Sequence, residues 1–343
     1  MSRKTCIALT GATGFVGSHV LAALLKQHHP LRLLVRNPQK LRLPQEAKGR
    51  LEIITGDLTD KDALRRLVDG ADAVIHIAGA VAAARPADFF RINTEAAVSL
   101  AECAESSGVR RFVHVSSLAA REPHLSAYAA SKAESERALI ALARRDDDAM
   151  RIAIVRPPAV YGPGDPATLG LIDQLSRKRA LLPGHENMRF SLIHAADLAE
   201  ALVRIATDEA ERIVQGEILE VDDGRPGGYT WPDIAAIVSD VMRRPVRVIH
   251  LPKGLVALAG QAASLYARLT GRAVILSPGK VRELYHHDWL ARSPKVQDRL
   301  DWTARRQFAE GFAETLSWYC AEGWLPANRL PAHLRKTSAA DHH

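Results

Sequence analysis

The sequence predicts an α/β protein with a doubly wound, mostly parallel sheet and a smaller C-terminal lobe. Near the start of the chain, an apolar run from Cys6 to Leu9 precedes the glycine-rich turn TGATGFVG at 10–17, after which leucine and valine recur at helical spacing. Further short apolar runs alternate with helical patterns along the first half of the chain. Strands that alternate with helices in this way pair in parallel, and this defines the fold class.

The glycine turn indicates a site for a dinucleotide phosphate. Gly11 suits a tight turn that a side chain would forbid, Gly14 lets the backbone approach a pyrophosphate, and Gly17 lets the helix pack close to its strand. The N-terminus of that helix then faces the anion. A Rossmann-type fold is therefore expected, with glycines spaced as GxxGxxG rather than GxGxxG.

The ends of the next two strands bear on the choice of cofactor. The strand 31–35 ends at Val35, where an acidic residue would accept a hydrogen bond from the ribose of NAD(H). Arg36 follows and can pair with the 2′-phosphate of NADP(H), although it could also be a solvated loop residue. NADP(H) is therefore favoured, and NAD(H) is the alternative. The strand 51–55 is followed by Asp57, which is placed to touch the adenine edge.

The fourth strand, 73–77, ends in Ala78 and Gly79, which are small enough for a nucleotide to lie over the sheet edge. A long helical segment is expected from about residue 87 to 106. It contains Asn93, which could hold a water molecule of a proton relay or could hydrogen-bond across the core.

The chemical centre is expected after the fifth strand, 111–115. Ser117 follows at its C-terminal end, where open α/β sheets place ligands. Tyr128 and Lys132 open the next helix, and their spacing puts both on one helical face. A tyrosine needs a pKa about 3 units below its usual 10, or roughly 4 kcal/mol, to act near pH 7. One partly desolvated cation at about 4 Å supplies roughly that energy.

These motifs together resemble the extended short-chain dehydrogenase/reductase family, also called the NAD-dependent epimerase/dehydratase family. Within it, the chain resembles the 3β-hydroxysteroid dehydrogenase and dihydroflavonol-4-reductase branch. The matching motifs are TGATGFVG at 10–17, GDLTD at 56–60, VSS at 115–117, YAASK at 128–132, RPPAVYGPGD at 156–165, IHAADLA at 193–199 and the helix 308–325.

The resemblance implies the roles of the site residues. Ser117 would polarise the substrate oxygen, Tyr128 would transfer the proton, Lys132 would orient the ribose and lower the tyrosine pKa, and Asn93 would support the relay. The expected cofactor contacts are Gly11, Thr13, Gly14, Phe15, Val16, Gly17, Arg36, Asp57, Leu58, Ala78, Gly79, Lys132, Pro157 and Val160. The short gap between Ser117 and Tyr128 predicts a more open pocket than in many extended members.

The expected organisation divides the chain into a cofactor-binding part and a substrate-binding part. The Rossmann domain covers 1–165 with a return to the sheet at about 190–222, the substrate-binding lobe covers 166–189 and 223–325, and the tail 326–343 is expected to be loosely ordered. Within the lobe, Leu255, Leu258, Ala262, Leu265 and Leu269 form a helical apolar stripe. The core of the lobe is the expected place for this stripe, and a substrate mouth or a membrane-surface face is the alternative.

Composition excludes several classes of protein. The 343 residues are 47% hydrophobic and 25% charged, as in globular proteins. The net charge is +7, but lysine and arginine are scattered, which fits an enzyme that binds polyanionic cofactors or lies near an anionic membrane better than a nucleic-acid-binding protein. Three cysteines without CxxC spacing argue against a disulfide framework or a zinc site, and no metal site is expected.

Location and assembly follow from similar observations. The first strand begins within five residues, which leaves no room for a signal peptide, and no apolar stretch reaches about 18 residues. A cytoplasmic protein without a membrane span is therefore expected, with peripheral membrane contact as an open alternative. The resemblance implies a homodimer that pairs the helices near 95–106 and 128–144.

The expected function is hydride transfer between NADP(H) and a secondary alcohol or ketone with a hydrophobic, steroid-like, aryl or alkyl body. A nucleotide-sugar 4-epimerase is the alternative, but sugar-modifying relatives carry an arginine where this chain has Phe190. Arg189 stands one place too early, and alternation would turn it away from the pocket while Phe190 faces the pocket. A non-catalytic cofactor-binding or assembly protein is a second alternative, disfavoured because Tyr128 and Lys132 are both present.

Overall fold

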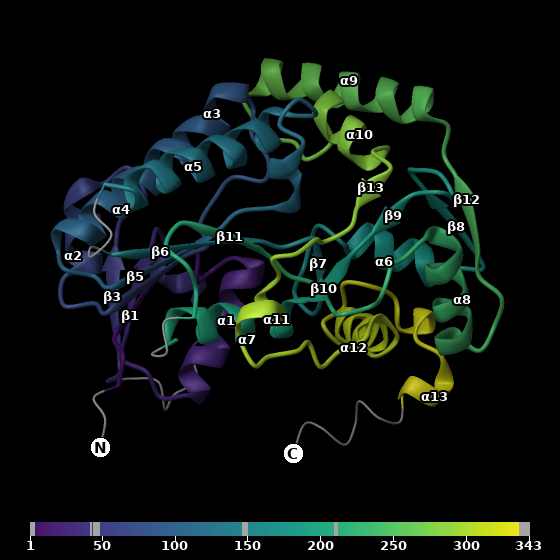
Figure 1. Ribbon diagram of the computed structural model, residues 1–343. Helices are drawn as coiled ribbons and strands as arrows, with labels where there is room; N and C mark the ends of the chain where they lie inside the picture. The colour runs from purple at the N-terminus through teal and green to yellow at the C-terminus, as the bar shows by residue number, and fades with distance from the viewer. Residues whose placement is uncertain (1–3, 42, 44–48, 146–149, 209–211, 336–343) are drawn as a thin grey trace.

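The computed structural model describes residues 4–41, 43, 49–145, 150–208 and 212–335, and within them a seven-stranded parallel sheet is the central element (Figure 1). In spatial order its strands are β11 (Glu217–Glu220), β6 (Arg151–Arg156), β5 (Arg111–Val115), β4 (Ala73–His76), β1 (Ile7–Thr10), β2 (Leu31–Val35) and β3 (Leu51–Thr55). The chain runs outward from β1 to β3, returns to β4 and continues to the other edge. The predicted doubly wound fold is confirmed.

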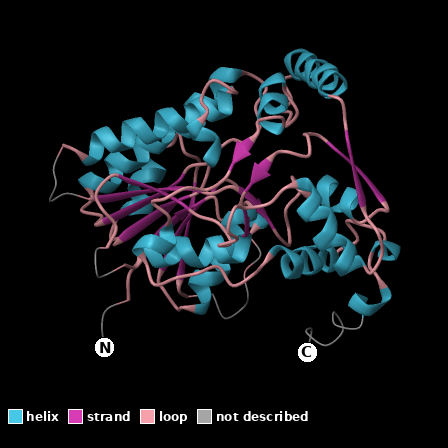
Figure 2. Cartoon of the chain, turned by 45° about the vertical axis from the view of Figure 1, so that its right-hand side comes forward, coloured by secondary structure: helices cyan, strands magenta, loops and turns pink. Residues whose placement is uncertain are grey.

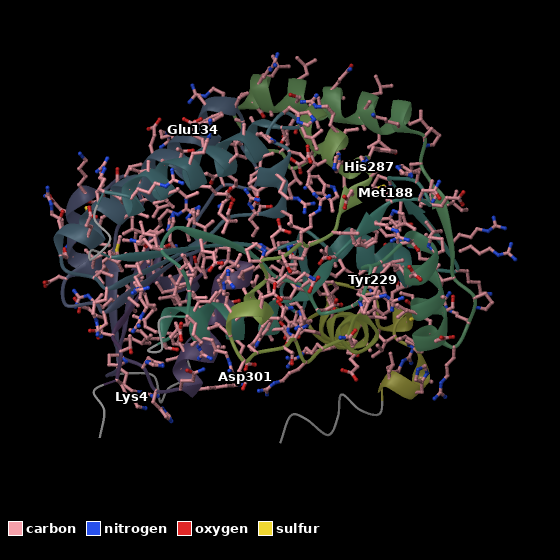
Figure 3. All side chains as sticks on the ribbon, viewed as in Figure 1. Lys4, Glu134, Met188, Tyr229, His287 and Asp301 are labelled. Atoms are coloured by element: carbon pink, nitrogen blue, oxygen red, sulfur yellow. The ribbon has the colours of Figure 1, made fainter. Side chains whose placement is uncertain are left out.

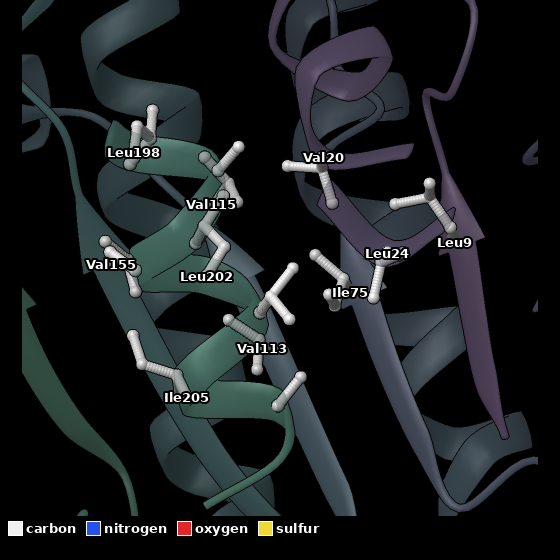
Figure 4. Close-up of a cluster of buried hydrophobic side chains, with 14 of the residues drawn as sticks. Leu9, Val20, Leu24, Ile75, Val113, Val115, Val155, Leu198, Leu202 and Ile205 are labelled. Carbon is white, nitrogen blue, oxygen red and sulfur yellow. The ribbon is translucent and has the colours of Figure 1, made fainter. Parts of the chain in front are cut away.

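Helices cover both faces of this sheet (Figures 1 and 2). The helices α1 (Phe15–Lys26) and α7 (Ala195–Ala206) lie on one face. The other face carries α2 (Lys61–Val68), α4 (Ala96–Ser106) and α5 (Ala127–Ala143). Alternation along β1 explains the two layers, because Leu9 belongs to the core under α1 and α7 while Ala8 belongs to the opposite core. Figure 4 shows the first of these cores.

The helical segment expected at 87–106 is one continuous run with a change of pitch inside it. It consists of α3 (Pro86–Phe90), a π-helical turn (Arg91–Glu95) and α4. Such turns insert one extra residue and are frequent at functional sites. Here the π-helical turn contains Asn93, whose side chain is buried.

We call the remaining elements the lobe. Most of them pack around a third hydrophobic cluster, while Val296 belongs to the core under α1 and α7. Its strands form three parallel pairs: β7 (Ala159–Tyr161) with β10 (Leu192–His194), β8 (Arg179–Leu182) with β12 (Arg247–His250), and β9 (Arg189–Phe190) with β13 (Asp288–Trp289). Its helices are α6 (Leu169–Leu175), α8 (Trp231–Met242), α9 (Lys253–Thr270), α10 (Pro278–Leu284), α11 (Val296–Arg299), α12 (Phe308–Ala321) and α13 (Ala332–Arg335).

Two expectations about the lobe differ from the structure. The apolar stripe of α9 is not in the core, because Leu255, Leu258, Leu265 and Leu269 are exposed. The start of the tail is packed rather than loose, since Leu330 is buried and the His333 side chain contacts the carbonyl oxygen of Val241 at 3.0 Å. Residues 336–343 lie outside the described part of the chain.

Candidate active site

The glycine turn forms a tight junction between β1 and α1. Gly11 has a φ of +82°, and a Cβ on it would lie 2.8 Å from the amide nitrogen of Ala78. A Cβ on Gly17 would lie 1.9 Å from the carbonyl oxygen of Gly11, so only glycine allows this approach. Gly14 caps α1 without a side-chain hydrogen bond, and Thr13 is exposed beside it. The first amides of α1 are therefore open to an anion.

At the ends of β2 and β3, Arg36 and Asp57 lie close enough to interact. The Asp57 carboxylate accepts hydrogen bonds from the hydroxyl and amide of Thr59 at 2.6 and 2.7 Å. These bonds, with a smaller contribution from the Arg36 charge, lower the pKa of Asp57. Asp60 caps α2 instead, by accepting from the amides of residues 62 and 63. Asp57 and Arg36 thus remain at the sheet edge, outside the helix cap.

The Asn93 side chain forms hydrogen bonds both to the segment after β4 and to α5. Its Oδ1 accepts from the amide of Ala80 at 2.7 Å, and its Nδ2 donates to the carbonyl oxygen of Ala80 and to Ser131 Oγ, both at 3.0 Å. The hydrogen bonds across the core are thus present, and a role of Asn93 in a proton relay stays a prediction. A Cβ on Gly79 would lie 3.0 Å from Asn93 Oδ1 and 3.5 Å from Lys132 Nζ, so glycine keeps this space open.

Tyr128 and Ser117 meet at the C-terminal end of the sheet. Burial raises the pKa of Tyr128 to about 12, while a hydrogen bond with Ser117 opposes the shift. The ring packs edge-on against Phe89 at 6.0 Å between centroids. The expected lowering of the tyrosine pKa is therefore absent here, because burial favours the neutral phenol.

Lys132 is anchored to the end of β5. Its Nζ donates to the carbonyl oxygen of Val115 at 2.8 Å, and the side chain is buried. Burial lowers the pKa of Lys132 to about 8, with the Glu136 carboxylate acting against the shift. That the ammonium lies close to the phenol oxygen stays a prediction.

A carboxylate that the sequence analysis missed lies near the tyrosine. Glu283 of α10 is buried, accepts a hydrogen bond from the Ser126 hydroxyl, and pairs with Lys280 Nζ at 2.9 Å. Its charge adds to the raised pKa of Tyr128. A Cβ on Gly279 would lie 2.7 Å from Ser126 Cβ, so α10 lies directly against the start of α5. No local pattern could connect these residues, because 157 positions separate Ser126 from Glu283.

A second group that the sequence analysis missed is an ion pair between α5 and β6. Glu136, one turn after Lys132, is buried and pairs with Arg156 through both carboxylate oxygens, at 2.8 and 2.5 Å. Arg156 also lies 3.7 Å from the carboxylate of Glu220, which Arg121 contacts at 3.3 Å. This network joins α5 to β6 and β11 and gives the Lys132 ammonium a nearby counter-charge.

The remaining predicted contacts lie around this centre. The carbonyl oxygen of Pro157 accepts from the amide of Leu118 at 2.9 Å, which links the end of β6 to the residue after Ser117. Val160 packs on the core beneath α1 and α7. That both residues touch a nicotinamide stays a prediction.

Arg189 and Phe190 point to opposite sides of β9, as alternation requires. Arg189 is exposed, whereas the Phe190 ring packs against Tyr229 and Trp231 at 6.5 and 5.0 Å between centroids. Tyr229, labelled in Figure 3, belongs to the hydrophobic cluster of the lobe. Phe190 is therefore part of the lobe's aromatic packing, and its role as a pocket wall stays a prediction.

Comparison with known proteins defines the class. The model of the NAD dependent epimerase/dehydratase family matches residues 7–221, so the chain belongs to that family. The family consists of NAD-dependent enzymes, and the resemblance noted in the sequence is confirmed. Within the described residues, no group of three or more His, Cys, Asp or Glu side chains is arranged to hold a metal ion.

Three similar proteins illustrate the range of the family. A ceramide reductase of Caulobacter vibrioides is 39% identical over 327 residues, which cover 94% of this chain and 96% of that protein. A 3 beta-hydroxysteroid dehydrogenase/Delta 5-->4-isomerase of Mycobacterium tuberculosis is 25% identical over 74% of this chain and 70% of its own length. The structure of MoeE5 in complex with UDP-glucuronic acid and NAD has a TM-score of 0.68 at 23% identity, covering 93% of this chain and 99% of that chain, and shows the shared fold.

Proposed function

We propose that this enzyme reduces the ketone of a hydrophobic, ceramide-type lipid with NADPH. The observation that carries the proposal is the placement of the Tyr128 phenol, which is hydrogen-bonded to Ser117 at the C-terminal sheet edge and packed against Phe89. A protonated phenol is the form that a reductase needs, because it donates the proton. The 39% identity to a ceramide reductase over nearly the whole chain supports the lipid substrate.

The residues of the chain fit a dinucleotide. Gly11 and Gly17 leave no room for side chains at the turn, the first amides of α1 are uncapped, and Gly79 keeps the space beside Lys132 open. When bound, the cofactor supplies the hydride that adds to the carbonyl carbon. We further propose that residues 1–165 bind the cofactor and that 166–189 and 223–325 bind the substrate.

Each polar group then has one task in the reduction. Ser117 donates a hydrogen bond to the substrate carbonyl oxygen and polarises it. Tyr128 transfers its proton to the same oxygen as the alcohol forms, which balances the hydride gained at carbon. Lys132, held by the carbonyl oxygen of Val115, stabilises the resulting phenolate through its positive charge. Asn93 holds Ala80 and α5 in fixed relative positions through its hydrogen bonds to both.

NADP(H) is the proposed cofactor because of Arg36. Its guanidinium is exposed at the end of β2, and no acidic residue takes the place of buried Val35. A guanidinium recognises a phosphate through charge-assisted hydrogen bonds, whereas a carboxylate at this position would repel it. The structure of MoeE5 contains NAD, so the choice must be measured for this chain.

The test is an assay of the purified chain against three substrate classes. NADPH oxidation is followed with keto forms of ceramide-type lipids in mixed micelles, with aryl and steroid ketones, and with UDP-sugars. We expect turnover of the lipid ketones, and Tyr128→Phe should lower it by two or more orders of magnitude while NADPH affinity stays nearly unchanged. Full activity of Tyr128→Phe would contradict the mechanism.

Two other outcomes would replace the proposal. Micromolar binding of uridine diphosphate that is lost in Arg189→Ala would favour a nucleotide-sugar 4-epimerase. Tight NADPH binding without turnover of any ketone or sugar would favour a non-catalytic cofactor-binding protein. We also retain as proposals a homodimer that pairs α4 and α5 and a cytoplasmic site of action, with a small-molecule substrate rather than a nucleic acid as partner.

A further inference from the structure

Helix α9 turns its apolar side to the solvent. In this fully described helix of 18 residues, only Gly260 and Ala267 are buried. Leu255, Leu258, Leu265 and Leu269 are 63%, 65%, 58% and 78% exposed. Their spacing puts these four leucines, which we call the leucine stripe, on one side of the helix. In Figure 1, α9 lies along the upper edge of the molecule with α10 beneath it.

Packing against α10 fixes this orientation. A Cβ on Gly260 would lie 2.9 Å from a methyl group of Val281 and 3.3 Å from the backbone of Ser277. Because the contact admits no side chain there, α9 cannot rotate a leucine into it without moving away from α10. The exposure of the leucine stripe is therefore a consequence of the small residues on the inner side of α9.

The charges around the leucine stripe are all positive. Lys253 begins the helix, Arg268 lies in its last turn, and Arg272 follows and donates to the Tyr266 hydroxyl at 3.4 Å. The sequence contains no aspartate or glutamate between Leu251 and Arg282. Leucines on one side of a helix with cations at its ends are typical of helices that lie on anionic membranes.

The same surface reaches toward the active site. Ala83, four residues after Gly79, forms a β-bridge with Val274, which follows α9. Val81 and Ile275, close to this bridge in sequence, are 67% and 52% exposed. Below α9, α10 carries Glu283, whose charge acts on Tyr128. An apolar molecule on the leucine stripe is thus near the elements that cover the catalytic tyrosine.

We propose that α9 docks on the surface of a bilayer that contains anionic lipids, with the leucine stripe inserted among the lipids. The docking rests on the surface alone. Its consequence, that a lipid ketone reaches Tyr128 directly from the membrane, rests on the proposed function. Among the described residues, no helix is long and apolar enough to span a bilayer, so α9 would lie in the plane of the surface.

A second copy of the chain fits this face less well. In an antiparallel pairing, Lys253 of one copy would face Arg268 and Arg272 of the other, and in a parallel pairing like charges would face each other. The absence of acidic residues from 251 to 282 leaves this repulsion uncompensated. Anionic headgroups supply the missing negative charge.

Cosedimentation of the full chain with vesicles tests the docking. The probes are phosphatidylcholine vesicles with and without phosphatidylglycerol. We expect at least about tenfold tighter binding to the anionic vesicles, weakened by added salt. Leu258→Gln/Leu265→Gln should reduce binding by about tenfold or more, and Arg268→Gln/Arg272→Gln should reduce it several-fold. Leu181→Gln, which changes a leucine that is 47% exposed on β8, is the matched control and should bind as the parent does.

Three results would overturn the inference. The parent chain does not bind anionic vesicles, the double leucine variant binds them unchanged, or sedimentation velocity shows that this variant only converts a dimer to a monomer. Circular dichroism confirms that each variant is folded. Reduction of a water-soluble ketone should survive in the leucine variant while reduction of a vesicle-borne ketone falls. Vesicle binding without reduction of any ketone would contradict the proposed function and leave the docking intact.

Discussion

Lys132 Nζ donates a hydrogen bond to the carbonyl oxygen of Val115 at 2.8 Å, so the ammonium ties α5 to the last residue of β5. The Tyr128 phenol four residues earlier has Ser117 and Glu283 as the groups that act on its pKa. The tyrosine is therefore held in its protonated form, and the buried lysine is held in place one helical turn away. Gly79 leaves the space beside Nζ unfilled, so Lys132 can meet a bound ligand without leaving Val115.

The first prediction concerns the pH dependence of stability in Lys132→Met. Folding lowers the pKa of Lys132 from 10.5 to about 8, so between these values the unfolded chain binds more protons than the folded chain. The contribution of Lys132 to stability therefore rises with pH from about 8 to 10.5, and it is least favourable below pH 8. The unfolding free energy of Lys132→Met minus that of the parent should therefore be about 2 kcal/mol larger at pH 7 than at pH 10.

Urea denaturation at several pH values measures this difference. Lys26→Met, which changes an exposed lysine at the end of α1, is the control and should follow the parent curve. If the unfolding free energies of Lys132→Met and the parent change with pH in parallel, the buried ammonium does not titrate in this range.

The second prediction concerns Glu283, whose negative charge raises the pKa of Tyr128. Glu283→Gln removes that charge, so the phenol should lose its proton at lower pH. Since ketone reduction needs the protonated phenol, the alkaline limb of the kcat/KM profile should move to lower pH. Lys280→Gln removes the ammonium that pairs with the Glu283 carboxylate at 2.9 Å. This variant should move the alkaline limb to higher pH. Superimposable profiles would exclude a charge effect of α10 on the tyrosine.

Local patterns were sufficient to predict much of this molecule. The glycine turn, the strands 31–35, 51–55 and 111–115, and the shared face of Tyr128 and Lys132 follow from spacing within a few residues. These features depend on backbone geometry and on periodicity, which the sequence displays directly.

Features that depend on distant contacts could not be predicted. The carbonyl partner of Lys132 and the contact of Glu283 with Ser126 join segments that no short pattern connects. The leucines of α9 show a stripe, but periodicity does not say which side of a helix faces water. Gly260, through its contact with Val281, decides that question, and a glycine in a helix gives no such signal by itself.

The third prediction compares two glycines near helix N-termini. Gly17→Ala would put a Cβ 1.9 Å from the carbonyl oxygen of Gly11, so β1 and α1 must separate. We expect a loss of about 3 kcal/mol or more of unfolding free energy, together with loss of NADPH binding. Gly170→Ala in α6 meets no atom within 4 Å and should gain about 0.5 to 1 kcal/mol. Chemical denaturation measures both, and equal stabilities would show that the turn relaxes without cost.

The last prediction concerns Arg36 and the choice between NADPH and NADH. Among the described residues Arg36 has no hydrogen bond or ion pair, and its neighbour Asp57 is already engaged by Thr59 at 2.6 and 2.7 Å. The guanidinium is therefore available for a 2′-phosphate, and NADPH should bind more tightly than NADH. Arg36→Ala should raise the Kd of NADPH by about tenfold or more and leave that of NADH nearly unchanged, because only NADPH carries the phosphate.

Fluorescence titration at low and high salt measures these affinities. Added salt should weaken NADPH binding in the parent more than in Arg36→Ala, since the contact is ionic and exposed. Arg36→Lys keeps the charge but loses the planar pair of donors. Its Kd for NADPH should therefore lie between those of the parent and of Arg36→Ala. Arg65→Ala, which removes an exposed arginine paired with Asp62, controls for the change in net charge. Equal affinities of the parent for NADPH and NADH would show that Arg36 is only a solvated loop residue.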